Sequence, residues 1–158
     1  MATKLKTQRQ ALDDLWSQGL SGTSLLRNLS GLADEFIRDC FAGIDKAEKD
    51  NQVALVALGG YGRQELFPFS DIDLMILFKP EIRKSVGAIA DAILYPLWDA
   101  KLEVGRSILT VQECIRPSFN NFTVLTSRMV VSCWGPALFT GFFRRLSGPG
   151  YTAKKRPF

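Results

Sequence analysis

The stretch that decides the fold is VALVALGGYGRQELFPFSDIDLMILF, residues 53–78. Residues 53–58 form a continuous apolar run, and residues 71–78 form a second, mostly apolar run; both are predicted to be buried strands. A glycine-rich turn lies between them, and two aspartates one residue apart open the second run. Ionised carboxylates are costly beside a buried strand, so these two need a partner that compensates their charge.

The two aspartates, Asp71 and Asp73, are expected to project from the same face of their strand, because residues i and i+2 do so. Two like charges so close repel each other and raise each other's pKa unless a cation binds between them. Mg²⁺ accepts one or two protein carboxylates and completes its shell with water and phosphate oxygens. The pair therefore predicts a Mg²⁺ site, with Mn²⁺ as the alternative ion, although an isolated D-x-D also occurs where aspartates merely cap an exposed strand.

The turn after the first strand contains Gly59, Gly60 and Gly62, followed by Arg63. Residues without a Cβ let backbone N–H groups approach an anion closely, and an arginine can present its fork to phosphate oxygens. A short helix over residues 61–67 would add to such a cradle. The alternative is a tight turn that needs φ > 0 and binds nothing. Ser70 fits a turn residue and is also a candidate nucleotide contact.

Three named motifs are excluded in this region. No G-K-[ST] follows the glycines as in a P-loop, and the third glycine of the dinucleotide fingerprint is missing. An EF-hand fails because Met75 and Ile76 stand where an oxygen ligand and a glycine belong.

Hydrophobic periodicity predicts helices and one further strand outside this stretch. Helices are expected over residues 4–18, from Ser24 through a wide apolar stripe, and from Pro80 to Leu97. A strand is expected over residues 101–111, then a short helix that Thr110 and Glu113 begin as a capping box, then helical patches over 122–134 and 137–146. The order predicts an α+β protein with one mixed sheet and helices packed on it.

The composition limits the classes of function. The 158 residues suffice for one globular domain, and the net charge of +4 is too mild and dispersed to suggest a nucleic-acid partner. Three well-separated cysteines are expected to be free, buried thiols of a reducing compartment, and no segment predicts a membrane span or a signal peptide, so we expect a cytoplasmic protein. The absence of histidine excludes histidine bases and most zinc sites.

Residues 58–77, LGGYGRQELFPFSDIDLMIL, resemble the signature of the DNA polymerase β-like nucleotidyltransferase superfamily, and within it the bacterial protein-PII uridylyltransferases. Residues 21–37 and 94–107 resemble the segments that flank that signature in the family. The resemblance implies a helical lead-in over residues 1–50 and a polymerase β-like nucleotidyltransferase core over 51–146. The tail over 147–158 has no periodicity, so we expect it to be disordered.

The same resemblance implies transfer of UMP from UTP to a tyrosine hydroxyl of the PII signal protein, with Mg²⁺. By position, Gly59 and Gly60 would approach the triphosphate, and Asp71 and Asp73 would hold the metals. The superfamily usually adds a third carboxylate from a later strand, and Glu103 is nominated for it, with a surface glutamate as the alternative.

The chain departs from the family in two respects. Gly105 and Ser107 flank an arginine where the family typically has histidine, and residues 127–135 lack the family's acid. The helical, histidine-aspartate hydrolase and sensing regions of full-length members have no counterpart here. We therefore expect the nucleotidyltransferase portion alone, from a truncated or degenerate gene product or as a piece cut from a longer chain.

Three other interpretations stay open at this stage. An adenylyltransferase relative is one, because no residue is identified that reads the base. A non-catalytic remnant that binds nucleotide or PII is the second. The third is a partner-binding α/β domain, for which Phe139, Phe142 and Phe143 are candidate contacts.

Overall fold

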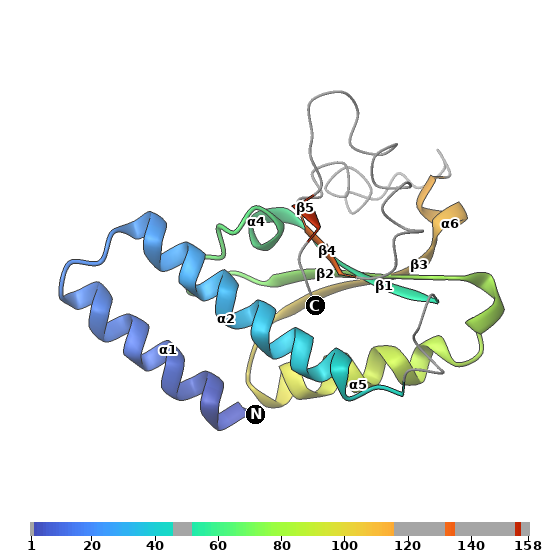
Figure 1. Cartoon of the computed structure of the whole chain (residues 1–158), viewed down its shortest axis with the longest axis horizontal. Coiled ribbons are helices and arrows are strands. Elements are labelled where there is room, and N and C mark those ends of the chain that lie inside the picture. Colours follow the sequence, from blue (N-terminus) through green and yellow to red (C-terminus); the bar gives the residue numbers. More distant parts are fainter. Residues whose placement is uncertain (1, 46–51, 116–131, 135–153, 156–158) are drawn as a thin grey trace.

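The structure, a computed structural model, describes residues 2–45, 52–115, 132–134 and 154–155, and it shows helices packed on a mixed β-sheet (Figure 1). The α+β class predicted from the sequence is confirmed. The elements are α1 (Ala2–Ser17), α2 (Gly22–Ala42), β1 (Val53–Ala57), α4 (Gly59–Gly62), β2 (Ile72–Phe78), the 3₁₀ turn η1 (Pro80–Ile82), α5 (Val86–Asp99), β3 (Val104–Thr110), α6 (Val111–Ile115), β4 (Ser132–Trp134) and β5 (Lys154–Lys155).

Helices α1 and α2 form an antiparallel pair joined by a tight turn. Gly19, with φ of +100°, ends α1: its N–H donates to Trp16 O (3.0 Å) and the next N–H, of Leu20, donates to Leu15 O (3.0 Å). This is the Schellman arrangement, which favours glycine at that position. Ser21 then caps α2, because its hydroxyl accepts a hydrogen bond from the N–H of Ser24 (3.3 Å).

Among the described residues, the sheet has five strands in the order β3-β2-β1-β4-β5. The pairs β1–β2 and β1–β4 are antiparallel, whereas β2–β3 and β4–β5 are parallel. The parallel β2–β3 pair requires a crossover, and α5 provides it. As a result, the end of β1 and the beginnings of β2 and β3 meet at the same edge of the sheet.

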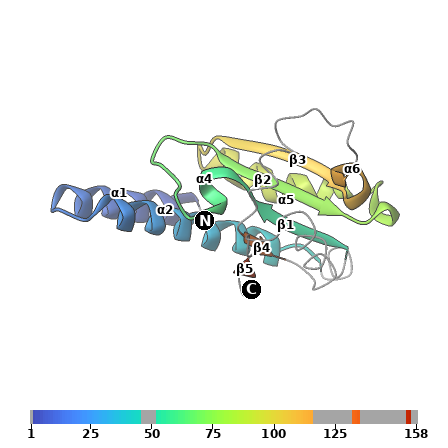
Figure 2. The same cartoon turned by 90° about the horizontal axis from the view of Figure 1, so that it is seen from above.

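The two faces of the sheet bury different residues. Helices α2 and α5 cover one face, where they pack against alternate residues of β1 and β2 such as Leu55, Leu74 and Ile76 (Figure 1). On the other face Val56, Met75 and Leu77 pack with Cys114 of α6. Seen from above, the α1–α2 pair projects beyond the sheet (Figure 2). β1 is buried on both faces, and so is β2 apart from the exposed Asp73, as their apolar runs predict.

Three local predictions differ from the structure. The short helix begins with the glycines at Gly59 instead of following them, because the left-handed φ of Gly59 (+54°) turns the chain immediately after β1. Pro80 opens the 3₁₀ turn η1, and α5 begins only at Val86. Residues 132–134 form strand β4 against β1 instead of the end of a helix, a long-range pairing that local periodicity cannot reveal.

The structure also bears on the expected cysteines, membrane spans and C-terminal helices. Cys40 is free and buried, as expected, and Cys114 is buried. Burial raises the pKa of the Cys40 thiol to about 11. None of the helices in the described ranges is long and apolar enough to cross a membrane. The predicted helical patches over 122–131 and 137–146, with their phenylalanines, lie outside the described residues, as does most of the tail over 147–158.

Candidate active site

Backbone hydrogen bonds bring the conspicuous residues of the sequence to one edge of the sheet. The N–H of Leu58 donates to Asp73 O (2.9 Å), which places the glycine turn directly beside the start of β2. The N–H of Ile72 donates to Glu103 O (2.9 Å), which places the start of β3 on the other side. The edge therefore joins the turn, both aspartates and the beginning of β3.

Asp73 lies between two glycines from different elements. A Cβ built on Gly59 would lie 2.7 Å from Oδ2 of Asp73, and a Cβ built on Gly105 would lie 2.5 Å from Oδ1. In the β2–β3 register, Asp73 and Gly105 are direct partners. By strand alternation with Met75 and Leu77, the Asp73 side chain is on the face opposite α2 and α5. The carboxylate thus lies in the gap between Gly59 and Gly105, which we call the slot, and Asp73 is otherwise exposed.

The pKa of Asp73 is raised, as expected for a carboxyl close to a second carboxylate. Partial burial raises the pKa of the Asp73 carboxyl above its usual value, and the negative charge of Asp71 raises it further. Asp71 is exposed and precedes β2 by one residue. A bound cation would relieve this repulsion, and two carboxylates beside each other are a donor set that suits Mg²⁺.

Two hydrogen bonds attach the glycine turn and the residues after it to α2. The hydroxyl of Tyr61, which is fully buried, donates to Oδ1 of Asp34 (2.7 Å), and burial raises the Tyr61 pKa well above its usual value. Ser30 of α2 accepts a hydrogen bond from the N–H of Leu66 (3.2 Å). These bonds fix both ends of the segment that begins with the glycines, so the position of the turn depends on α2.

Gly60 has a different role from Gly59. A Cβ on Gly60 would lie 3.1 Å from the carbonyl oxygen of Glu65, whose N–H in turn donates to Gly60 O (2.9 Å). Gly60 therefore allows the chain to fold back on itself within the turn. Its approach to a triphosphate stays a prediction.

Arg63 and Ser70 lie near the two ends of the loop that joins α4 to β2. Nε of Arg63 pairs with Oε2 of Glu65 at 2.9 Å, and both side chains are exposed. The hydroxyl of Ser70 donates to Phe67 O (3.1 Å), which is the turn contact expected from its position before Asp71. Nucleotide contacts by either residue stay predictions.

The third carboxylate nominated from the sequence, Glu103, lies one residue before β3 and is exposed. Its carbonyl oxygen accepts a hydrogen bond from the N–H of Ile72, the residue after Asp71, and the β2–β3 register begins at the next residue, Val104. Within the described parts of the chain, no group of three or more carboxylate or thiol side chains is close enough to hold a metal ion. The part of the site that the structure assembles is thus a pair of carboxylates, and the role of Glu103 stays a prediction.

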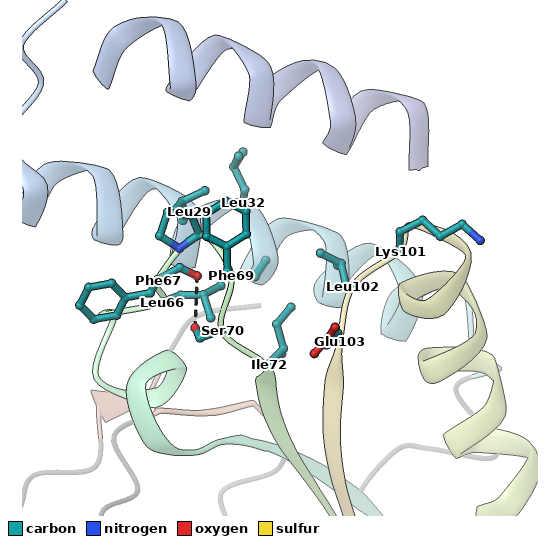
Figure 3. A pocket seen from close by; sticks show the side chains of 12 residues that line it. Leu29, Leu32, Leu66, Phe67, Phe69, Ser70, Ile72, Lys101, Leu102 and Glu103 are labelled. Carbon is teal, nitrogen blue, oxygen red and sulfur yellow. Dashed lines mark hydrogen bonds between the residues drawn. The ribbon is translucent and has the colours of Figure 1, made fainter. Parts of the chain in front are cut away.

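A pocket of about 200 Å³ opens next to this edge, on the side of α2 (Figure 3). Its walls are α2, the loop from Leu66 to Ser70 and the first residues leading into β3. Two aromatic side chains of that loop are conspicuously exposed, Phe67 at 61% and Phe69 at 98%. Sequence reasoning missed these exposed rings, and it also missed Asp34, because nothing local to either segment signals them.

The comparisons with known proteins agree with this geometry. The family described as "Putative nucleotidyltransferase DUF294" matches residues 6–105. The "Bifunctional uridylyltransferase/uridylyl-removing enzyme" of Pseudomonas aeruginosa (strain LESB58) is 36% identical over 121 residues, which are 77% of this chain and 13% of that protein. The enzyme of the same description from Stutzerimonas stutzeri (strain A1501) is 35% identical over 125 residues, which are 79% of this chain and 14% of that protein. That from Cupriavidus metallidurans (strain ATCC 43123 / DSM 2839 / NBRC 102507 / CH34) is 36% identical over 124 residues, which are 78% of this chain and 14% of that protein.

The chain therefore spans only a small part of the length of the curated relatives it matches. No solved structure matches the chain. The family match covers well over half of the residues, including the glycine turn, both aspartates and Gly105. The chain belongs to the nucleotidyltransferase family described as "Putative nucleotidyltransferase DUF294" and is homologous to a region of the bifunctional uridylyltransferases.

Proposed function

We propose that this chain is a Mg²⁺-dependent uridylyltransferase domain that moves UMP from UTP to a tyrosine hydroxyl of the PII signal protein. The observation that supports it most is the carboxylate of Asp73, confined between Gly59 and Gly105 beside the charge of Asp71. The names of the relatives describe them as uridylyltransferases. The PII acceptor comes from the resemblance of residues 58–77 to the PII-modifying family.

In the proposed reaction the tyrosine oxygen forms a bond to the α-phosphorus of UTP. The bond from that phosphorus to the bridging oxygen breaks, pyrophosphate leaves, and the hydroxyl proton passes to water. An in-line displacement of this kind requires the attacking and leaving oxygens to be held in line and their charge to be stabilised.

Asp71 and Asp73 would hold Mg²⁺, because they supply two carboxylates whose repulsion a cation relieves. When bound, the ion would stabilise the charge that develops on the phosphate oxygens. The task of the chain's own residues is positioning: Gly59 and Gly105 confine Asp73, and α2 fixes the turn through Tyr61 and Ser30.

The test is single-turnover labelling of PII by the full chain at stoichiometric concentration, with UTP labelled in its α-phosphate and with Mg²⁺. We expect label on PII with the wild-type chain, and its loss with Asp73→Asn or with chelator. Asp13→Asn, an exposed aspartate of α1, is the matched control and should transfer as well as wild type.

Two results would contradict the proposal. Label retained by Asp73→Asn would remove that carboxylate from the mechanism. No label from a folded wild-type chain that binds Mg²⁺–UTP would make it a nucleotide-binding remnant. Parallel reactions with ATP test the adenylyltransferase alternative.

A further inference from the structure

Gly105 stands at a position where its local backbone does not need glycine. It lies inside β3, and its φ is outside the left-handed region, unlike that of Gly59. Glycine within a strand weakens it, because it loses more conformational entropy and packs no side chain. The reason for glycine at this position must therefore lie in what is beside it.

The neighbour is the carboxylate of Asp73. A Cβ on Gly105 would lie 2.5 Å from Oδ1, 3.7 Å from Cγ and 3.9 Å from the Cα of Asp73. The nearest of these distances is far below any van der Waals contact, and it involves the far end of a side chain that can rotate. The backbone of β2 need not move if Asp73 swings away. An added methyl group should thus displace the carboxylate and leave the sheet intact.

The opposite side of the slot prevents a small adjustment. Oδ2 of Asp73 faces Gly59, where a Cβ would lie 2.7 Å away, so the backbone of the turn is close behind this oxygen. A carboxylate pushed from Gly105 would move toward that backbone. It can only leave the slot by changing its rotamer, which carries both oxygens away from their present positions.

We infer that Gly105 is a positioning residue, whose missing side chain keeps the Asp73 carboxylate in the orientation that the proposed metal and nucleotide site requires. The inference rests on the proposed function for its catalytic consequence, and on the distances at Gly105 and Gly59 for its geometry. It distinguishes Gly105 from Gly59, which its left-handed backbone would favour as glycine in any case.

The experiment is the variant Gly105→Ala, compared with Gly87→Ala as the matched control. Gly87 is an exposed residue of α5, and a Cβ there would meet nothing within 4 Å. We expect Gly105→Ala to weaken Mg²⁺-dependent binding of UTP at least about 10-fold, since displaced ligand partners commonly cost 10- to 100-fold. Its unfolding temperature should not fall below that of wild type. Gly87→Ala should bind as wild type does.

A second measurement reads the geometry directly. Three-bond NMR couplings to the Cγ of Asp73 report its χ1 rotamer in wild type and in Gly105→Ala, with or without nucleotide. We expect one rotamer in wild type and a different one in the variant. An unchanged rotamer, or unchanged Mg²⁺–UTP binding in a chain whose wild type binds it, would overturn the inference.

The two measurements separate the inference from the proposed function. If wild type itself binds no nucleotide, the proposed function fails, and the coupling measurement still decides whether Gly105 positions Asp73. If Gly105→Ala lowers the unfolding temperature and keeps the rotamer of Asp73, Gly105 has a merely structural role.

Discussion

At the scale of single residues, Asp73 is a charged group at a position that disfavours its charge. Burial and the neighbouring Asp71 raise its pKa in the folded state, so the folded state binds the proton of Asp73 more tightly than the unfolded state does. Stability must then fall as the pH rises through the folded-state pKa. At neutral pH and without metal, the ionised Asp73 destabilises the fold.

The variant Asp73→Asn tests this directly. Without metal at pH 7 it should unfold at a higher temperature than wild type, because a neutral amide replaces a disfavoured charge. The difference should shrink on acidification, as wild-type Asp73 becomes neutral too. Thermal unfolding in the presence of chelator at a series of pH values measures both effects. A lower unfolding temperature for Asp73→Asn would contradict the account; Asp91→Asn, exposed on α5, should change little.

At the scale of elements, the site depends on helix α2 although α2 contributes no proposed ligand. The buried hydrogen bond from Tyr61 to Asp34 and the bond from Leu66 to Ser30 attach the glycine turn and the following loop to that helix. A buried hydrogen bond to a carboxylate contributes more than one on the surface, because removing one partner leaves a desolvated polar group behind.

Tyr61→Phe removes the hydroxyl and keeps the ring. We expect a loss of about 1.5–3 kcal/mol in the free energy of unfolding, together with weaker nucleotide binding because the turn loses an anchor. Urea unfolding and calorimetry measure the two effects. Tyr95→Phe, at an exposed tyrosine of α5, is the control. Equal stability of Tyr61→Phe and wild type would show that the bond does not hold the turn.

The start of α6 is a second element that depends on one carboxylate. Glu113 accepts hydrogen bonds from the N–H (2.7 Å) and the hydroxyl (2.8 Å) of Thr110, and Arg83 pairs with it at 2.7 Å. These contacts lower the pKa of Glu113 from 4.5 to about 2. The hydrogen bond from the Thr110 backbone N–H contributes most, followed by the bonds from the Arg83 side chain and the Thr110 hydroxyl. This is the capping box that residues 110 and 113 predict in the sequence.

A carboxyl whose folded-state pKa is lowered stabilises the fold above its unfolded pKa, and this stability is lost as the pH falls toward the folded value. Glu113→Gln should therefore be less stable than wild type at pH 7, by up to about 1 kcal/mol. The difference should disappear between about pH 4.5 and about pH 2. Unfolding curves across this range measure it, with Glu81→Gln of η1 as the control. A difference that persists at pH 2 would exclude the charge of Glu113 as its cause.

The elements that local signals specify could be predicted from the sequence. The apolar stripe of α2, the continuous runs of β1 and β2, and the capping box before α6 all lie where the sequence places them, within a few residues. The pairing of β4 with β1 could not be predicted, because it depends on contacts between residues far apart in the chain. The same limit applies to the site: the sequence indicated Asp73, but only the β2–β3 register shows that Gly105 faces it.

At the scale of the whole molecule, the two faces of the sheet have separate tasks. Helices α2 and α5 cover one face and build the larger core, which holds the strands in register (Figure 1). The opposite face, at the edge where β2 and β3 begin, presents the carboxylate of Asp73. The main hydrophobic core and the proposed site thus lie on different faces of the sheet. Replacing the two aspartates should therefore leave the packing of that core unchanged.

The most direct test of this account is calorimetric titration of UTP into the full chain with and without Mg²⁺, repeated on Asp71→Asn/Asp73→Asn. The control is Asp13→Asn/Asp14→Asn, which removes the same two charges from exposed positions of α1. We predict Mg²⁺-dependent binding by wild type and by the control, and a loss of more than about 100-fold in the Asp71/Asp73 variant, since a direct ligand should cost more than an outer partner. Equal binding by both double variants, or no binding by a folded wild-type chain, would contradict a metal–nucleotide site at this edge of the sheet.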